Sequence, residues 1–193
     1  MVRIKHFKYI PMKKKLILQL ILLFSITINV YCDDDTDFLS RHAKGSKCFV
    51  LNTGAFTKGF YGSLGYSYYF SKYYFLDGNL SFERGKYNLT NFSSFRLNAN
   101  NNINYFTFHK TIFCNGHLGL FLGNESISET ILNNKSKNSF TYGLYLGTNC
   151  EYYITNNFSL NLGINQNFIR KSLIRDSYIS IDFGGRFFFG HLF

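Results

Sequence analysis

The sequence predicts an all-β protein, an eight-stranded antiparallel up-and-down transmembrane β-barrel that follows an N-terminal signal peptide. The last fifteen residues, Ile179–Phe193, alternate between large apolar side chains and small or polar ones, as a strand with two different faces does. Similar alternation recurs along the chain in eight segments of about 9–14 residues. The composition, with 23 Phe, 15 Tyr and a single Pro, suits strands and interfacial aromatic belts.

Residues 1–32 have the pattern of a signal peptide. The basic cluster Lys13–Lys15 precedes the apolar run Leu16–Tyr31, and Val30-Tyr31-Cys32 offers a cleavage site. The chain starts at Met1 or at Met12. A retained anchor is an alternative, but the run is shorter than the roughly 20 residues of a spanning helix. A lipid-modified Cys32 is a second alternative, disfavoured by the bulky Tyr31 before it. We therefore expect export, a flexible tail over residues 33–46 and a barrel domain over residues 47–193.

The charge and the cysteines narrow the class of protein. Residues 1–32 hold six of the 21 basic residues and none of the 11 acidic ones, so without them the formal charge falls from +10 to +4. The remaining chain has no clustered basic stripe, and we expect no direct nucleic-acid binding. Cys48, Cys114 and Cys150 lack CxxC spacing, so a zinc site or a disulfide framework is not expected. A single disulfide between two of these cysteines is compatible with an oxidising periplasm.

The first half of the barrel domain contains four predicted strands. Phe49, Leu51 and Ala55 alternate weakly with polar residues. The strand over residues 61–70 alternates clearly. It forms the sharpest amphipathic hairpin of the chain with the next strand, in which Asp77, Asn79, Ser81 and Glu83 oppose Leu76, Gly78, Leu80 and Phe82. The fourth strand, Phe95–His109, is expected to be broken by the Asn-rich run Asn98–Asn102, where the register stays open.

The second half contains the other four strands. They cover Ile112–Gly123, Phe140–Glu151, Phe158–Asn167 and the terminal segment. In each, Leu, Ile, Phe or Tyr alternates with Gly, Asn, Ser or a charged residue, which is the inside-to-outside pattern of a membrane barrel. At eight strands, side chains are expected to fill the interior.

The connections are predicted to alternate in length. Short turns lie at 71–72, 109–111 and 155–157, and longer polar loops at 84–94, 124–138 and 169–177. Short turns on one side and long loops on the other are typical of outer-membrane barrels. A soluble sandwich or lipocalin-like barrel, with the Phe-rich face inside, is the competing interpretation.

The C-terminal half resembles the conjugal-transfer protein TraO family of Bacteroides-type conjugative transposons. The segments that carry the resemblance are Phe140–Leu146, Glu151–Leu160, Asn165–Phe168 and Phe183–Phe189, with a looser fit from Gly54 to Tyr87. The Asn-rich stretch and the Gly190–Phe193 extension depart from the family pattern. The resemblance implies an outer-membrane component of a conjugative DNA-transfer apparatus, with other transfer proteins as partners.

Five polar residues are candidates for chemistry: His117, Asp77, Glu83, Glu151 and Asp182. A histidine near a carboxylate and a serine could serve acyl transfer or hydrolysis. However, the chain lacks a nucleophile-elbow motif and metal-ligand spacing. We instead expect Glu83, Glu151, Asp182 and Arg186 to form paired charges that fill the interior. No catalytic, cofactor-binding or metal residue is assigned, and no cofactor or small-molecule substrate is expected.

The remaining histidines and the tyrosine pairs are expected near the membrane interfaces. His109 lies at a predicted turn and His191 near the chain end, while Tyr68-Tyr69, Tyr73-Tyr74 and Tyr152-Tyr153 flank short turns. The predicted function is a non-enzymatic outer-membrane barrel of a conjugative apparatus. The alternatives are a general small barrel for adhesion or envelope integrity, and a barrel enzyme acting on lipid or peptide.

Overall fold

The computed structural model describes residues 42–87, 90–109, 111–129 and 136–189. They form eight strands: β1 Lys47–Phe56, β2 Gly59–Tyr69, β3 Tyr74–Tyr87, β4 Thr90–Phe108, β5 Ile112–Glu129, β6 Ser136–Thr155, β7 Phe158–Arg170 and β8 Ser177–Phe189. Within the described ranges, no helix is long and apolar enough to cross a membrane. The predicted all-β class and strand count are confirmed.

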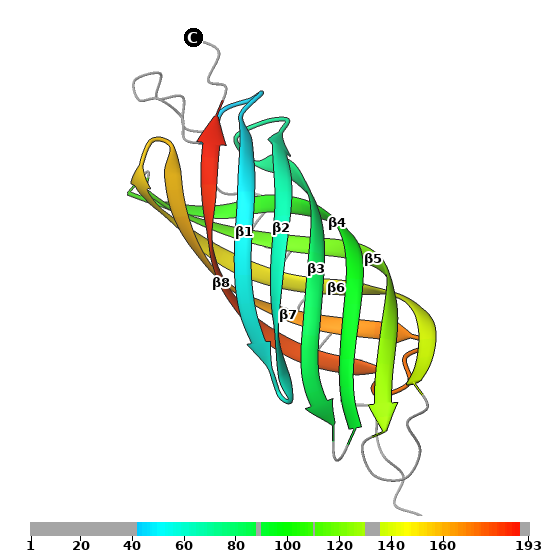
Figure 1. Ribbon diagram of the computed structural model, residues 1–193. Helices are drawn as coiled ribbons and strands as arrows, with labels where there is room; N and C mark the ends of the chain where they lie inside the picture. Colours follow the sequence, from blue (N-terminus) through cyan, green and yellow to red (C-terminus); the bar gives the residue numbers. More distant parts are fainter. Residues whose placement is uncertain (1–41, 88–89, 110, 130–135, 190–193) are drawn as a thin grey trace, which may run out of the picture. The chain divides into compact units, whose positions relative to one another are not determined.

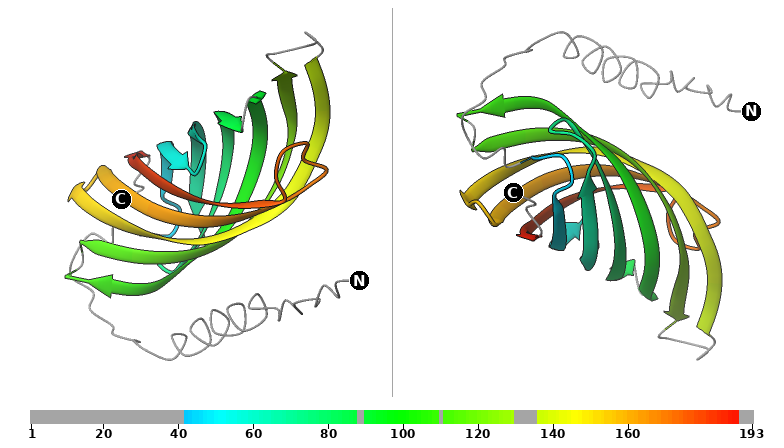
Figure 2. Two further views of the ribbon diagram at one scale, coloured as in Figure 1. Left: turned by 90° about the horizontal axis from the view of Figure 1, so that it is seen from below. Right: turned by 90° about the horizontal axis from the view of Figure 1, so that it is seen from above.

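Each strand pairs antiparallel with its neighbour in sequence, and β1 pairs with β8 to close the barrel. The closing ladder runs from Lys47 opposite Phe189 to Phe56 opposite Ser180, so β8 (red) lies beside β1 (cyan) in Figures 1 and 2. We call the end where β1 starts and β8 finishes the terminal end. The opposite end, which carries the β7–β8 connection at residues 171–176, is called the loop end.

The alternating residues face the sides that the membrane interpretation requires. In β8, Ile181, Phe183 and Phe187 are more than half exposed, whereas Asp182 and Arg186 are buried. The same holds around the barrel, where exposed Leu and Phe side chains cover the outer wall. A soluble barrel would hide these side chains because burying apolar surface stabilises folding in water. The soluble interpretation is therefore wrong.

The predicted break in the fourth strand is also wrong. β4 runs without interruption through the Asn-rich stretch, and Asn98, Asn102 and Asn104 are buried on the inner face. Asparagine disfavours strands in a soluble sheet, but in this barrel two of these amides bond to amides of the neighbouring strands. Asn98 Nδ2 donates to Asn79 Oδ1 at 2.6 Å, and Asn104 Nδ2 donates to Asn115 Oδ1 at 3.1 Å. A polar interior thus turns a loop-like sequence into a strand.

Two of the three predicted long loops are largely strand. Residues 84–87 and 90–94 belong to β3 and β4, and 124–129 and 136–138 belong to β5 and β6. Inward-facing Phe92 and Ile127 are buried there, which continues the alternation beyond the expected ends. The third loop is close to its prediction, since it spans residues 171–176. The short turns at 71–72, 109–111 and 155–157 lie where the sequence predicts them, although β6 continues to Thr155.

The described part of the predicted tail is not loose. His42 and Ser46 are buried, and Gly45 N donates to the Tyr69 carbonyl at 2.7 Å. The tail prediction therefore does not hold for residues 42–46. The predicted signal peptide, the rest of the tail and His191 lie outside the described residues.

The three cysteines lie on different faces of the sheet. Cys48 is buried on the inner face, whereas Cys114 and Cys150 oppose each other across β5 and β6 toward the outside. Their Sγ atoms are 2.8 Å apart. Cys48 is thus separated from Cys114 and Cys150, because it lies on the opposite face of the sheet.

Candidate functional site in the barrel interior

The interior is lined by polar side chains from the inward register of all eight strands. Most of the charged ones gather in two groups, one near each end, and amides, hydroxyls, His117 and Asp182 lie between the groups. The free space between them is about 80 Å³, enough for only a handful of water molecules. We call the two charged groups the loop-end cluster and the terminal-end cluster.

The loop-end cluster contains Glu83, Arg96, Glu125 and Arg175, with Tyr178 beside them. Arg96 Nη1 donates to Glu83 Oε1 at 2.6 Å and Arg175 Nη2 donates to Glu83 Oε2 at 2.8 Å. The Tyr178 hydroxyl also donates to Glu83, so one carboxylate receives three donors. The cluster has two acids and two bases, and each buried charge has the opposite charge close by, as burial requires.

The β7–β8 loop folds into the mouth at this end. The Ser172 hydroxyl donates to both oxygens of Glu125, at 3.1 and 3.0 Å, and the Leu173 backbone N–H donates to Oε1 at 2.8 Å. The Arg175 guanidinium lies 3.6 Å from the Tyr178 ring centroid and 4.2 Å from that of Phe56. Burial lowers the pKa of Arg175, an effect that the Glu83 carboxylate opposes. The loop therefore closes the loop end of the interior.

The terminal-end cluster is built on Arg186. Its Nη2 donates to Asp77 Oδ2 at 3.2 Å, its Nη1 donates to the Tyr69 hydroxyl at 2.8 Å, and its Nε lies 3.9 Å from Glu151 Oε2. Glu151 also accepts a hydrogen bond from Ser159. Of the four charges that the sequence predicts to pair in the interior, only Glu151 and Arg186 lie together here, and Asp77 joins them.

His42 closes the terminal end. Its ring stacks on Phe113 with centroids 4.1 Å apart, and lies 4.9 Å from the ring of Tyr69. Its Nε2 is 3.2 Å from Glu151 Oε2. The side chain is 1% exposed, so the segment before β1 plugs the mouth with one aromatic, polar group.

Between the clusters, the candidate His117 is not part of a triad. Its Nε2 donates to Asn165 Oδ1 at 2.5 Å, and Asn165 Nδ2 in turn donates to Asp182 Oδ1 at 2.6 Å. An amide therefore separates the histidine from the carboxylate, and within the described ranges no serine hydroxyl is hydrogen-bonded to His117. In the part of the chain that the structure describes, no group of three or more His, Cys, Asp and Glu side chains could hold a metal.

The five candidates are thus divided among three places. Asp77 and Glu151 are together, Glu83 is at the other end, and His117 and Asp182 are linked through Asn165. The expectation that Asp182 pairs with a charge is not met, because Asp182 accepts a hydrogen bond from the Asn165 amide. Sequence reasoning missed five members of the clusters, which are His42, Arg96, Glu125, Arg175 and Tyr178. A continuous alternation through β4 and β5 would have placed Arg96 and Glu125 inside.

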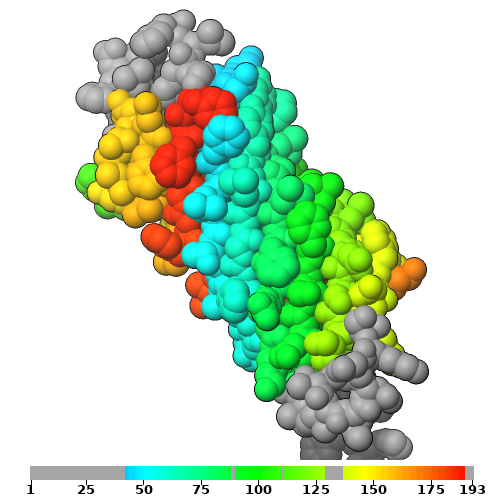
Figure 3. Space-filling view, in the orientation of Figure 1, coloured from blue at the N-terminus to red at the C-terminus, as the bar shows by residue number. Residues whose placement is uncertain are grey.

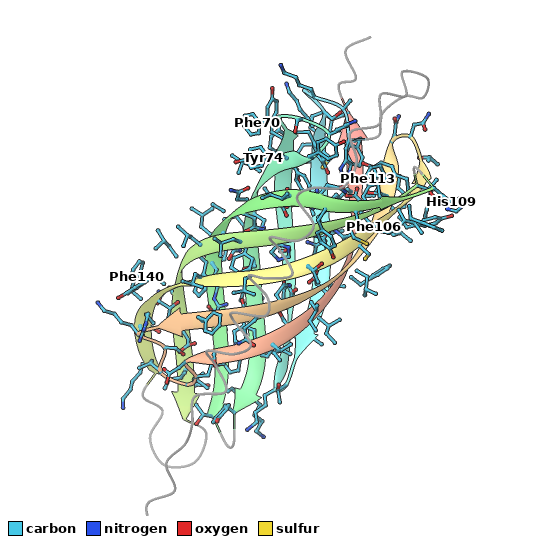
Figure 4. The ribbon with its side chains drawn as sticks, turned by 180° about the vertical axis from the view of Figure 1, so that it is seen from behind. Phe70, Tyr74, Phe106, His109, Phe113 and Phe140 are labelled. Carbon is cyan, nitrogen blue, oxygen red and sulfur yellow. The ribbon has the colours of Figure 1, made fainter. Side chains whose placement is uncertain are left out.

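The tyrosine pairs are split between the two faces. Tyr69 and Tyr153 are buried in the interior near His42, while Tyr73 and Tyr152 are exposed near the short turns. Figure 4 shows the outer aromatic side chains, including Phe70, Phe106 and Phe140, and His109 at the tip of the β4–β5 hairpin. Two of the six tyrosines of the predicted belt therefore lie in the interior beside His42.

Comparison with solved structures agrees with this architecture. Neisserial surface protein A (NspA) is similar with a TM-score of 0.58 and 18% identity, over 75% of this chain and 95% of that one. The N-terminal β-barrel domain of Pseudomonas aeruginosa OprF gives 0.54 and 16%, over 76% and 98%. Yersinia pestis Ail, in complex with the heparin analogue sucrose octasulfate, gives 0.52 and 15%, over 76% and 99%.

No family model and no curated protein matches the chain. At such identities the likeness concerns the fold alone. From its closed barrel, apolar outer wall and polar interior, the chain has the fold of the small eight-stranded outer-membrane β-barrels.

Proposed function

We propose that this protein is a non-enzymatic barrel of the bacterial outer membrane that works by holding partners at its ends. The observation that carries the proposal is the state of the interior. Glu83 and Asp77 are paired with arginines, Asp182 and Glu125 accept hydrogen bonds from neutral groups, and the β7–β8 loop and His42 close the two mouths. A substrate would have to displace these contacts to reach His117 or the carboxylates. The groups that remain accessible are on the ends and on the outer wall.

The proposal is tested by fractionation. The mature protein is expected in the outer membrane, extracted only by detergent, and migrating faster on gels before heating than after. Recovery as a soluble periplasmic monomer would overturn it. Turnover of a lipid or peptide that is lost in His117→Ala would overturn the non-enzymatic part.

A narrower assignment, to a conjugative DNA-transfer apparatus, rests on the resemblance of Phe140–Leu146 and Phe183–Phe189 to the TraO family. Its test is a mating assay with three donor strains: one in which the gene is deleted, and two that produce the wild type or His117→Ala at matched membrane levels. Deletion is expected to lower transfer, and His117→Ala to leave it intact. Full transfer from the deletion strain would favour the alternative of a general adhesion or envelope-integrity barrel.

A further inference from the structure

We propose that the outer wall carries a binding site for a phosphorylated, acylated lipid. The site has two parts. The wall groove is an apolar hollow on the outer wall, lined by residues of β7, β8, β1, β2, β3 and β4. Figure 3 shows the outer surface of β1 and β2 (cyan), which lie between the other strands of the groove. The cation patch is the group Lys58, Arg84 and Lys86 at the loop end of the same strands. The inference rests on the proposed membrane location and adds a ligand to it.

Small residues form the floor of the wall groove. Thr53 pairs with Gly62 across β1 and β2, and Gly185 lies opposite Leu51 in β8. A Cβ atom on Gly62 would meet only the Asn52 carbonyl oxygen, at 3.9 Å, so the space above Gly62 is open. The Thr53 hydroxyl donates to the Tyr61 carbonyl at 3.2 Å. Its polar group is therefore satisfied, and the floor presents mostly apolar atoms.

Large apolar side chains form the walls. Phe158, Phe183 and Phe187 line the groove from β7 and β8, and Phe82 and Phe95 line it from β3 and β4. Four of these phenylalanines, all but Phe158, are about half exposed. A hollow of this kind on a lipid-facing wall fits an acyl chain, because it offers apolar contact on more than one side.

The cation patch begins where the groove ends. Arg84 is the next outward residue after Phe82 in β3 and pairs with Phe60 across β2. Lys86 N donates to the Lys58 carbonyl at 2.9 Å, which joins the β1–β2 turn to β3, and Lys58 Nζ lies 3.8 Å from the Tyr87 ring centroid. All three cationic side chains are exposed.

No acid balances these cations on the outer face of their strands. The acidic residues of β1–β4 are Asp77 and Glu83, and both are buried in the interior, where arginines neutralise them. An exposed cation cluster at the edge of an apolar belt attracts anionic headgroups. A phosphate with attached acyl chains satisfies both parts at once, whereas a neutral lipid would leave the cations unmatched and a free phosphate would leave the groove unused.

The test is a lipid titration of the detergent-refolded full-length barrel, followed by native mass spectrometry. The probes are lipid A, which is a bisphosphorylated and acylated glucosamine disaccharide, phosphatidylcholine and inorganic phosphate. The variant K58Q/R84Q/K86Q is expected to bind lipid A about 100-fold more weakly, since each basic residue contributes about one factor of five. Gly62→Phe, which fills the groove, is expected to weaken lipid A binding while leaving the cations in place.

The matched control is R170Q/K171Q, which removes two exposed cations at the same end but on the β7 side of the barrel. It is expected to bind lipid A like the wild type. The proposal fails if lipid A binds no better than phosphatidylcholine, if the control loses as much affinity as the patch variant, or if inorganic phosphate competes at equal concentration. Each variant is checked for the barrel gel shift, so that loss of lipid binding is separated from failure of the membrane-barrel proposal itself.

Discussion

At the scale of single residues, the position of a side chain relative to the wall decides its effect on stability. Glu83 is 3% exposed and Leu120 is 66% exposed, yet in a membrane barrel neither side chain is surrounded by water. The first is shielded from water with two arginines, and the second faces lipid. Substitutions at the two positions therefore test the inner and outer environments separately.

Glu83→Gln is expected to lower the free energy of unfolding by about 3 kcal/mol, because Arg96 and Arg175 lose the carboxylate that both contact. The measurement is urea unfolding in lipid vesicles, followed by the gel shift. Lys137→Gln, which changes an exposed residue, serves as the control and is expected to have almost no effect. Equal stability of Glu83→Gln and wild type would show that the cluster is not a structural ion pair.

Leu120→Arg is expected to cost about 2–4 kcal/mol of folding free energy, since Leu120 lies on the outer face near the middle of β5. Asn124→Arg is the matched change on the same face, closer to the loop end, and is expected to cost about 0–1 kcal/mol. The same unfolding assay compares the two. A cost for Asn124→Arg as large as for Leu120→Arg would contradict the proposed depth of the strand in the bilayer.

At the scale of elements, β5 holds two neighbours in place. Its Cys114 lies opposite Cys150 of β6, and its Glu125 accepts a hydrogen bond from the Leu173 N–H in the β7–β8 loop. Each contact belongs to one element pair and can be broken without removing a strand.

The cross-strand cysteines are expected to form an intramolecular disulfide when the folded barrel is treated with diamide as oxidant. Cys114 and Cys150 face each other across the ladder, while Cys48 is on the other face of the sheet. Peptide mapping under non-reducing conditions should recover the 114–150 link, and Cys48→Ser should not change it. A link that includes Cys48 would contradict the position of Cys48 on the inner face of the barrel.

Glu125→Ala is expected to loosen the β7–β8 loop, because the Leu173 N–H and the Ser172 hydroxyl lose a charged acceptor. Hydrogen bonds to charged groups contribute about 1.5–3 kcal/mol, so the Leu173 amide should exchange roughly 10–100-fold faster. Hydrogen exchange with mass spectrometry measures this, and Glu125→Gln, which retains an acceptor, should lie between. Unchanged exchange in Glu125→Ala would mean that other contacts hold the loop.

At the scale of the whole molecule, the interior is a packed core in which polar groups lie beside two clusters of buried, mostly aromatic side chains. The clusters and the amides between them leave about 80 Å³ of free space, and His42 and Arg175 close the two ends. Contacts between interior side chains therefore stabilise the barrel, while its apolar surface faces outward.

The wild-type barrel is expected to give no steady large currents in planar lipid bilayers, because eight strands leave an interior that side chains fill. Single-channel recording measures this, with a large porin in the same bilayer as the positive control. Steady large conductance would mean that the plugs open or that the active form has more strands.

Much of the architecture could be predicted from the sequence. The alternation of Ile181, Phe183 and Phe187 with Asp182 and Arg186 identifies the outer and inner faces, since side chains in a strand alternate with a period of two. The sequence pattern predicts loops or a strand break at several polar stretches whose polar residues instead line the inner face of a strand. Asn98–Asn102 looks like a loop by local preference, but Asn98 and Asn102 are buried on the inner face of β4, and Asn98 bonds to Asn79 and Ser81 of the neighbouring strand.

The sequence by itself determined the strand number, the faces and the closed all-β class, because these follow from local periodicity and from the need to pair every strand edge. Only the tertiary structure decided which interior groups meet. Arg175 reaches Glu83 across 92 positions and His42 reaches Glu151 across 109. Such pairs depend on the stagger between strands and on how the loop and the tail fold back. Those are properties of the closed barrel, and no local pattern encodes them.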